Sequence, residues 1–72
     1  MIVEEKKGTG VLTQREIEVL NLLSNGFSSK QIGKELFIST RTVETHRLNI
    51  MKKLGTSNSA ETISVAAKLN LI

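Results

Sequence analysis

The residues of this 72-residue sequence with the most chemical potential lie in its central third, where cations and hydroxyls are concentrated. Residues 28–53 contain six Lys or Arg side chains against two Glu, a net charge of +4, whereas the rest of the chain sums to −1. Such cations either keep a helix surface soluble or neutralise the phosphates of a polyanion. Charge alone leaves both interpretations open. The arrangement of these residues on the predicted helices distinguishes between them.

Groups needed for other kinds of chemistry are scarce. The sequence has no Cys, no Asp and a single His. It therefore lacks the thiolate ligands of a zinc site and the set of residues that forms a catalytic triad. The seven acidic residues are all Glu, and the five within predicted helices are scattered over helix surfaces. We therefore expect no enzymatic activity, no metal or other cofactor, and no small-molecule ligand in this domain.

Composition and hydropathy patterning predict one small soluble domain. The chain is 39% hydrophobic and 24% charged, which is the balance of a globular protein. The longest uninterrupted apolar run is three residues, and the N-terminus lacks the pattern of a signal peptide. Together with the absence of Cys, these features predict a cytoplasmic protein with no membrane contact.

Start and stop signals divide the chain into four predicted helices, and no segment shows the two-residue periodicity of a strand. Thr, Ser or Asn marks each helix start, while Gly26 and Gly55 mark the ends of the first and third helices. The predicted helices cover approximately residues 13–25, 28 to Leu36 or Phe37, 40–54 and 58–69. The sequence thus predicts an all-α, four-helix domain over residues 12–72, preceded by a flexible tail or linker at residues 1–11.

Two features of the first two helices bear on their packing. Thr13 and Glu16 match a reciprocal capping box, as do Ser28 and Gln31, and we expect no further role for Thr13 and Glu16. Gly33 lies inside the second helix, where glycine costs about 1 kcal/mol relative to Ala. One reason to tolerate it there is the close approach of another helix.

The third predicted helix has two contrasting sides at about 100° per residue. Val43, Ile50 and Leu54 share an apolar side with Arg47, and this side must face the core. The opposite side, called the outward face below, mixes cations with hydroxyl, amide and apolar groups: Arg41, Thr45, Leu48, Asn49 and Lys52. A short helix, a tight connection and a longer helix with such a face predict a helix-turn-helix, in which the third helix lies in the DNA major groove.

This geometry assigns candidate DNA contacts by residue type. Glu44, Thr45 and Leu48 are expected to meet base edges, because Glu can accept from cytosine and the Leu or Thr methyl groups can touch thymine. Hydroxyls at helix starts and nearby cations are expected to contact phosphates: Ser28, Ser29, Ser39, Thr40, Thr42, Lys30, Arg41, Arg47, Lys52 and Lys53. Two alternatives stay open. Arg47 can instead pair with a Glu of another helix, and Glu44 can orient a neighbouring Arg or disfavour wrong sites.

The fourth predicted helix has two apolar faces, although a small monomer needs only one. Ile63, Ala66 and Ala67 form the first face. The second face consists of Val65, Leu69 and Ile72. It is either a partly packed helix end or the patch of a weak symmetric homodimer. We favour the dimer, since two copies match two half-sites on DNA.

Several motifs in a fixed order carry a family resemblance: Leu12-Thr13-x-Arg15-Glu16-x-Glu18-Val19-Leu20, Gly26-x-Ser28-x-Lys30-x-Ile32, Leu36-x-Ile38-Ser39-x-x-Thr42-Val43-x-x-His46 and Lys53-Leu54-Gly55. Through them, residues 12–72 resemble the helix-turn-helix domain of LuxR/FixJ-type (GerE-like) bacterial transcriptional regulators. The resemblance implies sequence-specific binding of double-stranded DNA, by the C-terminal effector domain of a two-component response regulator or by a stand-alone regulator. It also implies dimerisation through the fourth helix, DNA-backbone positions for Lys30, Thr42 and His46, and RNA polymerase as a further partner.

Two positions depart from this family's pattern, and two other function classes stay open. Gly33 stands where the family usually has Ala, and Ser59 stands where Arg is common at the start of the fourth helix. The salt bridge or phosphate contact that such an Arg would make is therefore not carried over to this chain.

One alternative function is a helical protein-interaction module whose basic face meets an acidic partner. The other is the promoter-reading region of a sigma factor, against which the fourth helix argues. Sequence-specific DNA binding alone predicts that Thr45 affects base preference.

Overall fold

Hydrogen bonds at the helix starts determine where the elements of this protein begin. The computed structural model describes residues 12–72, so the tail predicted at residues 1–11 lies outside the described residues. This part of the chain forms four helices and no strand: α1 (Gln14–Ser24), α2 (Ser29–Leu36), α3 (Thr40–Leu54) and α4 (Ser59–Lys68). The predicted all-α, four-helix architecture is confirmed.

The four helix starts are capped by Thr13, Ser28, Ser39 and Asn58. Each of these side chains accepts the backbone N–H of the residue three positions later. Thr13 and Ser28 also donate their own N–H groups to the side chain at that later position, which completes both predicted capping boxes. These bonds satisfy N–H groups that a helix leaves unpaired in its first turn.

The ends of α2 and α3 reach the same backbone conformation with different residues. Gly55 follows α3 with φ of 69°, which glycine adopts at little steric cost. Phe37 follows α2 with φ of 58°, although it carries a side chain. Its N–H donates to the Gly33 carbonyl, and the residue is 92% exposed. The sequence placed the end of α2 correctly but gave no signal for a left-handed, exposed Phe.

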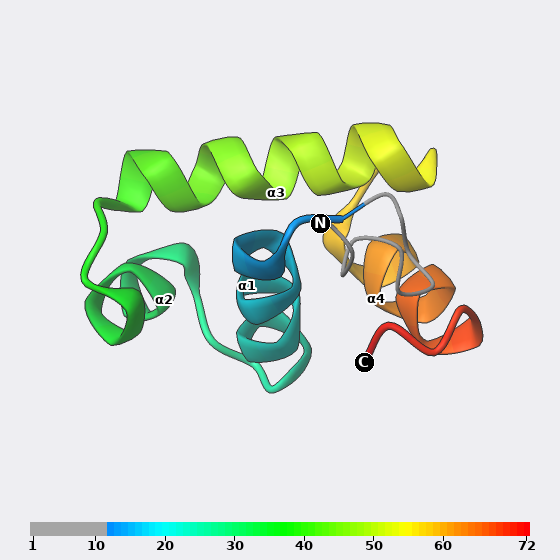
Figure 1. Cartoon of the computed structure of the whole chain (residues 1–72), viewed down its shortest axis with the longest axis horizontal. Coiled ribbons are helices and arrows are strands. Elements are labelled where there is room, and N and C mark those ends of the chain that lie inside the picture. The colour runs from blue at the N-terminus through cyan, green and yellow to red at the C-terminus, as the bar shows by residue number, and fades with distance from the viewer. Residues whose placement is uncertain (1–11) are drawn as a thin grey trace.

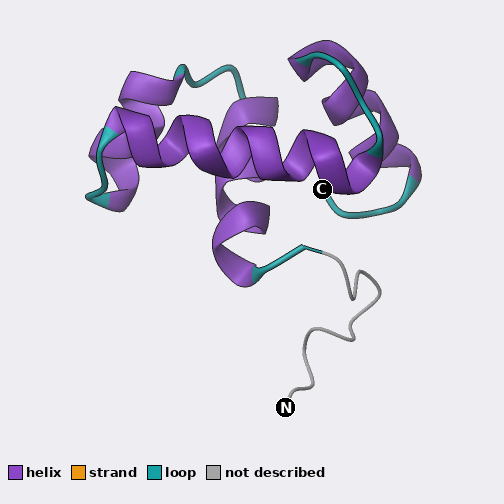
Figure 2. Cartoon of the chain, turned by 90° about the horizontal axis from the view of Figure 1, so that it is seen from above, coloured by secondary structure: helices purple, strands orange, loops and turns teal. Residues whose placement is uncertain are grey.

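The other three helices pack against α3. In Figure 1, α3 runs across the top of the molecule, with α2, α1 and α4 beneath it. Figure 2 looks down on its open side. The core takes side chains from every helix and from the segment before α1: Leu12, Val19, Leu20, Ile32, Val43, Ile50 and Ala66. One side of α3 is therefore buried along its length, while none of the other helices described in residues 12–72 lies on the opposite side.

Gly33 lies where α2 comes closest to the chain leading into α3. A Cβ at this position would be 2.7 Å from the carbonyl oxygen of Ile38, which is too close for packed atoms. The Ile38 N–H also donates to the Gly33 carbonyl at 3.0 Å. A close approach at Gly33 is confirmed. The nearest atom belongs to the connection between α2 and α3, and the backbone nitrogen of Thr40, the first residue of α3, follows at 3.5 Å.

We expect Gly33→Val to lower the free energy of unfolding by about 2 kcal/mol or more, because the added side chain must push the backbone of the connection away. Lys34→Val is the matched control, since Lys34 is exposed in the same helix and reports only the intrinsic cost of Val there. Urea unfolding followed by circular dichroism measures both variants. Equal losses would show that the close approach places no tight limit on position 33.

Candidate nucleic-acid interface

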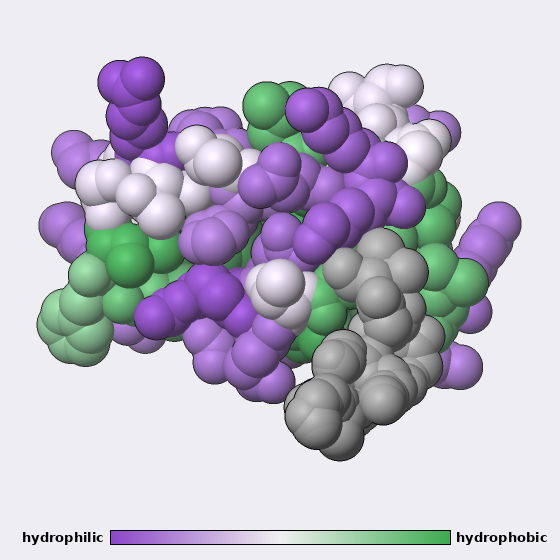
Figure 3. Space-filling model, turned by 45° about the horizontal axis from the view of Figure 1, so that its top comes forward, coloured by the Kyte–Doolittle hydropathy of each residue, from purple (hydrophilic) through white to green (hydrophobic). Residues whose placement is uncertain are grey.

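The outward face of α3 is accessible and chemically mixed. Arg41, Thr45, Leu48 and Lys52 are exposed, Leu48 with 53% of its surface accessible. The Thr45 hydroxyl donates to the Arg41 carbonyl at 3.1 Å, which restricts the Thr45 side chain. Figure 3 shows a mainly hydrophilic surface on this side of the molecule, with apolar side chains among the polar ones. Such a helix offers a major groove both hydrogen-bonding and methyl groups.

Glu44 lies at the edge of this face nearest to Arg47. Its side chain is 58% exposed, and its Oε2 is 3.8 Å from Nη1 of Arg47. A long, solvent-exposed ion pair of this kind contributes little to stability. Glu44 therefore remains free to turn towards a groove, as the sequence predicted for a base contact.

Hydroxyls gather at the first turns of α2 and α3. Ser28 and Ser39 cap these helices as acceptors, and a hydroxyl that accepts from an N–H still has a proton to donate. The Ser39 and Thr42 hydroxyl oxygens are 2.9 Å apart, so one donates to the other, while Thr40 is exposed. Helix N-termini carry partial positive charge, so both first turns favour a phosphate oxygen.

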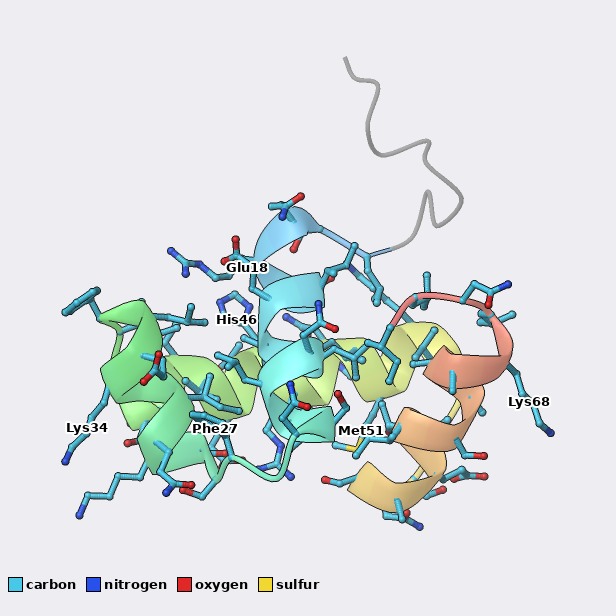
Figure 4. The ribbon with its side chains drawn as sticks, turned by 90° about the horizontal axis from the view of Figure 1, so that it is seen from below. Glu18, Phe27, Lys34, His46, Met51 and Lys68 are labelled. Atoms are coloured by element: carbon cyan, nitrogen blue, oxygen red, sulfur yellow. The ribbon has the colours of Figure 1, made fainter. Side chains whose placement is uncertain are left out.

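The predicted phosphate-binding cations fall into two groups. Lys30, Arg41 and Lys52 are exposed and have no ion-pair partner within residues 12–72. Lys53 and Arg47, by contrast, bind other side chains of this protein. His46 is half-buried and lies in Figure 4 at the edge of α3 where Glu18 of α1 also lies, so it is only partly accessible.

Lys53 forms an ion pair with the buried start of α1. Its Nζ lies 2.8 Å from Oε1 of Glu16, whose side chain is 5% exposed. The same oxygen accepts the N–H of Thr13, so one carboxylate caps α1 and holds the last turn of α3. The prediction that Glu16 is only a capping residue was therefore wrong.

Arg47 is bound to hydroxyls of two other helices. Its Nη1 donates to Oγ of Ser29 at 2.6 Å, and its Nη2 donates to Oγ of Ser59. Its side chain is only 23% exposed, and Ser29, expected to contact phosphate, is buried. The expected partner of Arg47 was a Glu or a phosphate, and neither serine was predicted. No local signal marks them, because they are 18 and 12 positions away along the chain.

The second apolar face of α4 is open mainly at its C-terminal end. Val65 is half-buried, whereas Leu69 is 57% and Ile72 is 38% exposed. Leu71, between these two, packs against the core. Leu69 is the C-cap of α4 and Ile72 lies beyond the helix, so the prediction that Ile72 continues its second apolar face was wrong. The exposed pair Leu69 and Ile72 is the surface at and beyond the end of α4 against which a second molecule can bury apolar surface.

Two further observations concern residues 12–72. No three His or Glu side chains in this range gather closely enough to hold a metal ion. None of the helices in the range combines the length and the apolar character needed to cross a bilayer.

The sequence matches a family described as bacterial regulatory proteins, luxR family, over residues 10–66. It is similar to the oxygen regulatory protein NreC of Staphylococcus aureus, with 40% identity over 62 residues. That alignment covers 86% of this chain and 29% of NreC, so the chain spans less than a third of the length of this relative.

Two solved structures resemble this protein in fold and sequence. A crystal structure of the response regulator ChrA, from a heme-sensing two-component system, has a TM-score of 0.82 and 44% identity, and the match covers 85% of this chain and 30% of ChrA. The transcription factor GerE has a TM-score of 0.81 and 38% identity, and the match covers 85% of this chain and 91% of GerE. The chain is thus similar to nearly all of one structure and to one part of the other.

The ion pair between Lys53 and Glu16 generates a stability prediction. We expect Lys53→Met to lower the free energy of unfolding by about 1–2 kcal/mol, because the nearly buried Glu16 carboxylate loses its ionic partner. The loss is moderate because Lys53 is partly exposed to solvent, which weakens the ion pair. Lys52→Met is the matched control, since Lys52 is exposed in the same helical turn and has no such partner. A double-mutant cycle with Glu16→Gln, read by urea unfolding, gives the coupling. Zero coupling would contradict a stabilising role for the pair.

Proposed function

This chain belongs to the luxR family of bacterial regulatory proteins, and from that membership we propose that it binds double-stranded DNA sequence-specifically to regulate transcription. The outward face of α3 enters the major groove. Glu44, Thr45 and Leu48 meet base edges there, with the methyl groups of Thr45 and Leu48 suited to thymine.

One observation carries this proposal. α3 is packed against α1, α2 and α4 on one side, and its other side presents Arg41 and Lys52 to solvent without ion-pair partners among the described residues. Two exposed cations beside Thr45 and Leu48 are poorly suited to a buried protein contact, because burial would leave their charges unpaired. They are well suited to flank a groove lined by phosphates.

Phosphate contacts surround the base-reading residues. Positive helix ends and hydroxyls contribute at the starts of α2 and α3, and cations contribute at the edges of the groove. The proposed backbone contacts are Ser28, Lys30, Thr40, Arg41, Thr42, His46 and Lys52. Their function is to fix the register of α3 on the duplex, since phosphate contacts carry no direct sequence information.

The wider role follows from the relatives. GerE, a transcription factor, is matched over almost its full length, whereas ChrA, a response regulator, is matched over under a third of its chain. We infer that this domain serves either as the DNA-binding part of a response regulator or as a stand-alone regulator. It acts in the cytoplasm as a weak homodimer through Val65 of α4 and through Leu69 and Ile72 at and beyond the end of that helix, and RNA polymerase is the further partner that such a role implies.

Fluorescence anisotropy with a pool of random 25-base-pair duplexes tests the proposal. We expect log affinity to fall roughly linearly with log salt, by several counterions per molecule. Sequencing the bound fraction should return two half-sites related by symmetry, as a dimer requires. Absence of binding at low salt would overturn the proposal and favour a helical module that binds an acidic protein.

Base reading and phosphate binding predict different variant behaviour. Thr45→Ala should relax the preference at one base position by roughly fivefold while affinity for random duplexes stays nearly constant. Lys52→Ala should weaken binding to all sequences alike and reduce the salt slope by about one. Lys68→Ala, an exposed cation on α4, is the control and should change neither. Identical behaviour of the Thr45 and Lys52 variants would rule out this division of roles.

A further inference from the structure

Arg47 connects three helices through one side chain, and we propose that it is a positioning residue that fixes α4 relative to α3 and so sets the spacing of the two DNA half-sites. It is then not a contact to the DNA backbone. This inference rests on the proposed function, because half-site spacing has meaning only for a DNA-binding dimer.

The hydrogen bonds of Arg47 reach the first residues of two different helices. Ser29 is the first residue of α2, and Ser59 is the first residue of α4. The two guanidinium nitrogens each donate to one of these hydroxyls, at 2.6 Å for Ser29. A guanidinium is rigid and planar, so the two bonds fix the starts of α2 and α4 at a defined separation across α3.

The surroundings of Arg47 favour a structural role. Arg47 and Ser59 line a small hollow together with Leu23, Ile50, Met51 and Thr62, and most of the Arg47 side chain is withdrawn from solvent. Hydrogen bonds to a charged group are stronger where water is scarce. Arg47 is thus held from the inside of the molecule, unlike Arg41 and Lys52 on the outward face.

Charge attraction does not account for this placement. The starts of α2 and α4 are the positive ends of helix dipoles, which disfavour a nearby cation. Glu44, the one acidic partner among the described residues, is 3.8 Å from Nη1 and largely exposed, so it compensates only weakly. The two serine hydroxyls are what make the position favourable, and both lie on elements other than α3.

The start of α4 is also bonded to the residues that precede it. The Thr62 hydroxyl donates to the Asn58 carbonyl at 2.7 Å and lies 2.6 Å from the Thr56 hydroxyl. Arg47 and these bonds together hold the start of α4. Leu69, the C-cap of α4, and Ile72, beyond its end, are exposed. A small rotation at Ser59 is amplified at that end, which would move one recognition helix of a dimer relative to the other.

Two variants test the role of Arg47 without touching the outward face. Ser59→Ala removes one acceptor, and Arg47→Lys keeps the charge but cannot bridge two hydroxyls with one rigid fork. Ser64→Ala, an exposed serine of α4, is the control. Each protein is titrated with duplexes that carry one selected half-site, or two half-sites at the selected spacing and at one base pair more or less.

We expect both variants to bind a single half-site within about twofold of the wild type, with an unchanged salt slope. Their preference for the selected spacing over its neighbours should fall at least about fivefold. Retention of the wild-type spacing preference by Ser59→Ala and Arg47→Lys would overturn the proposal. The proposal would also be overturned if Arg47→Lys kept the wild-type spacing preference, half-site affinity and salt slope while Arg47→Met lost half-site affinity and one unit of salt slope. That pattern identifies Arg47 as a phosphate contact.

Failure of the proposed function gives a different pattern. Then the wild type itself does not bind the duplexes, and amide hydrogen exchange in the free chain tests Arg47 separately. Ser59→Ala and Arg47→Lys should speed exchange in the first two turns of α4 at least about threefold, with no change for Ser64→Ala. Unchanged exchange would overturn the positioning role, and a selected site with only one half-site would overturn its link to spacing.

Discussion

The structure depends on α3 being buried along one side only. Val43 and Ile50 are fully buried, and each large aliphatic side chain of this kind contributes about 1.5–3 kcal/mol through burial. A chain of 72 residues buries enough apolar surface for only one small core. The helices α1, α2 and α4 therefore all pack on α3. The opposite side of α3 is then not needed for packing against the other described helices. It can therefore hold cations, hydroxyls and Leu48 in the pattern of a groove-binding surface.

Polar contacts orient this helix once the apolar core has placed it. Lys53 joins the end of α3 to the start of α1, and Arg47 joins its middle to the starts of α2 and α4. Two of the cations that give the central segment its positive charge are thus bound to other side chains of the molecule. The charge count of the sequence overstates the number available to a polyanion, and the exposed cations of the outward face and α2 define the interface more closely.

The helix starts could be predicted because their chemistry is local. Each cap joins residues three positions apart, so Thr13, Ser28 and Asn58 were recognisable without any tertiary information, and Ser39 was one of two candidates beside Thr40. The partners of Arg47 and Lys53 could not be predicted, since they lie 12 to 37 positions away and depend on how the helices cross. Ser59 was visible as a departure from the family pattern, but only the fold shows that it accepts a hydrogen bond from Arg47. The left-handed conformation of Phe37 could not be predicted, because this position lacks the glycine that normally signals such a turn.

The open side of α3 is the surface proposed to bind DNA. Amide NMR spectra, recorded while a duplex that carries the selected site is added to the chain, show whether it does. We expect the largest shift changes at Thr45, Leu48 and Lys52 of α3 and at Lys30 of α2. Changes on exposed residues of α1, such as Arg15 and Asn21, with the outward face of α3 unperturbed, would show that DNA binds elsewhere.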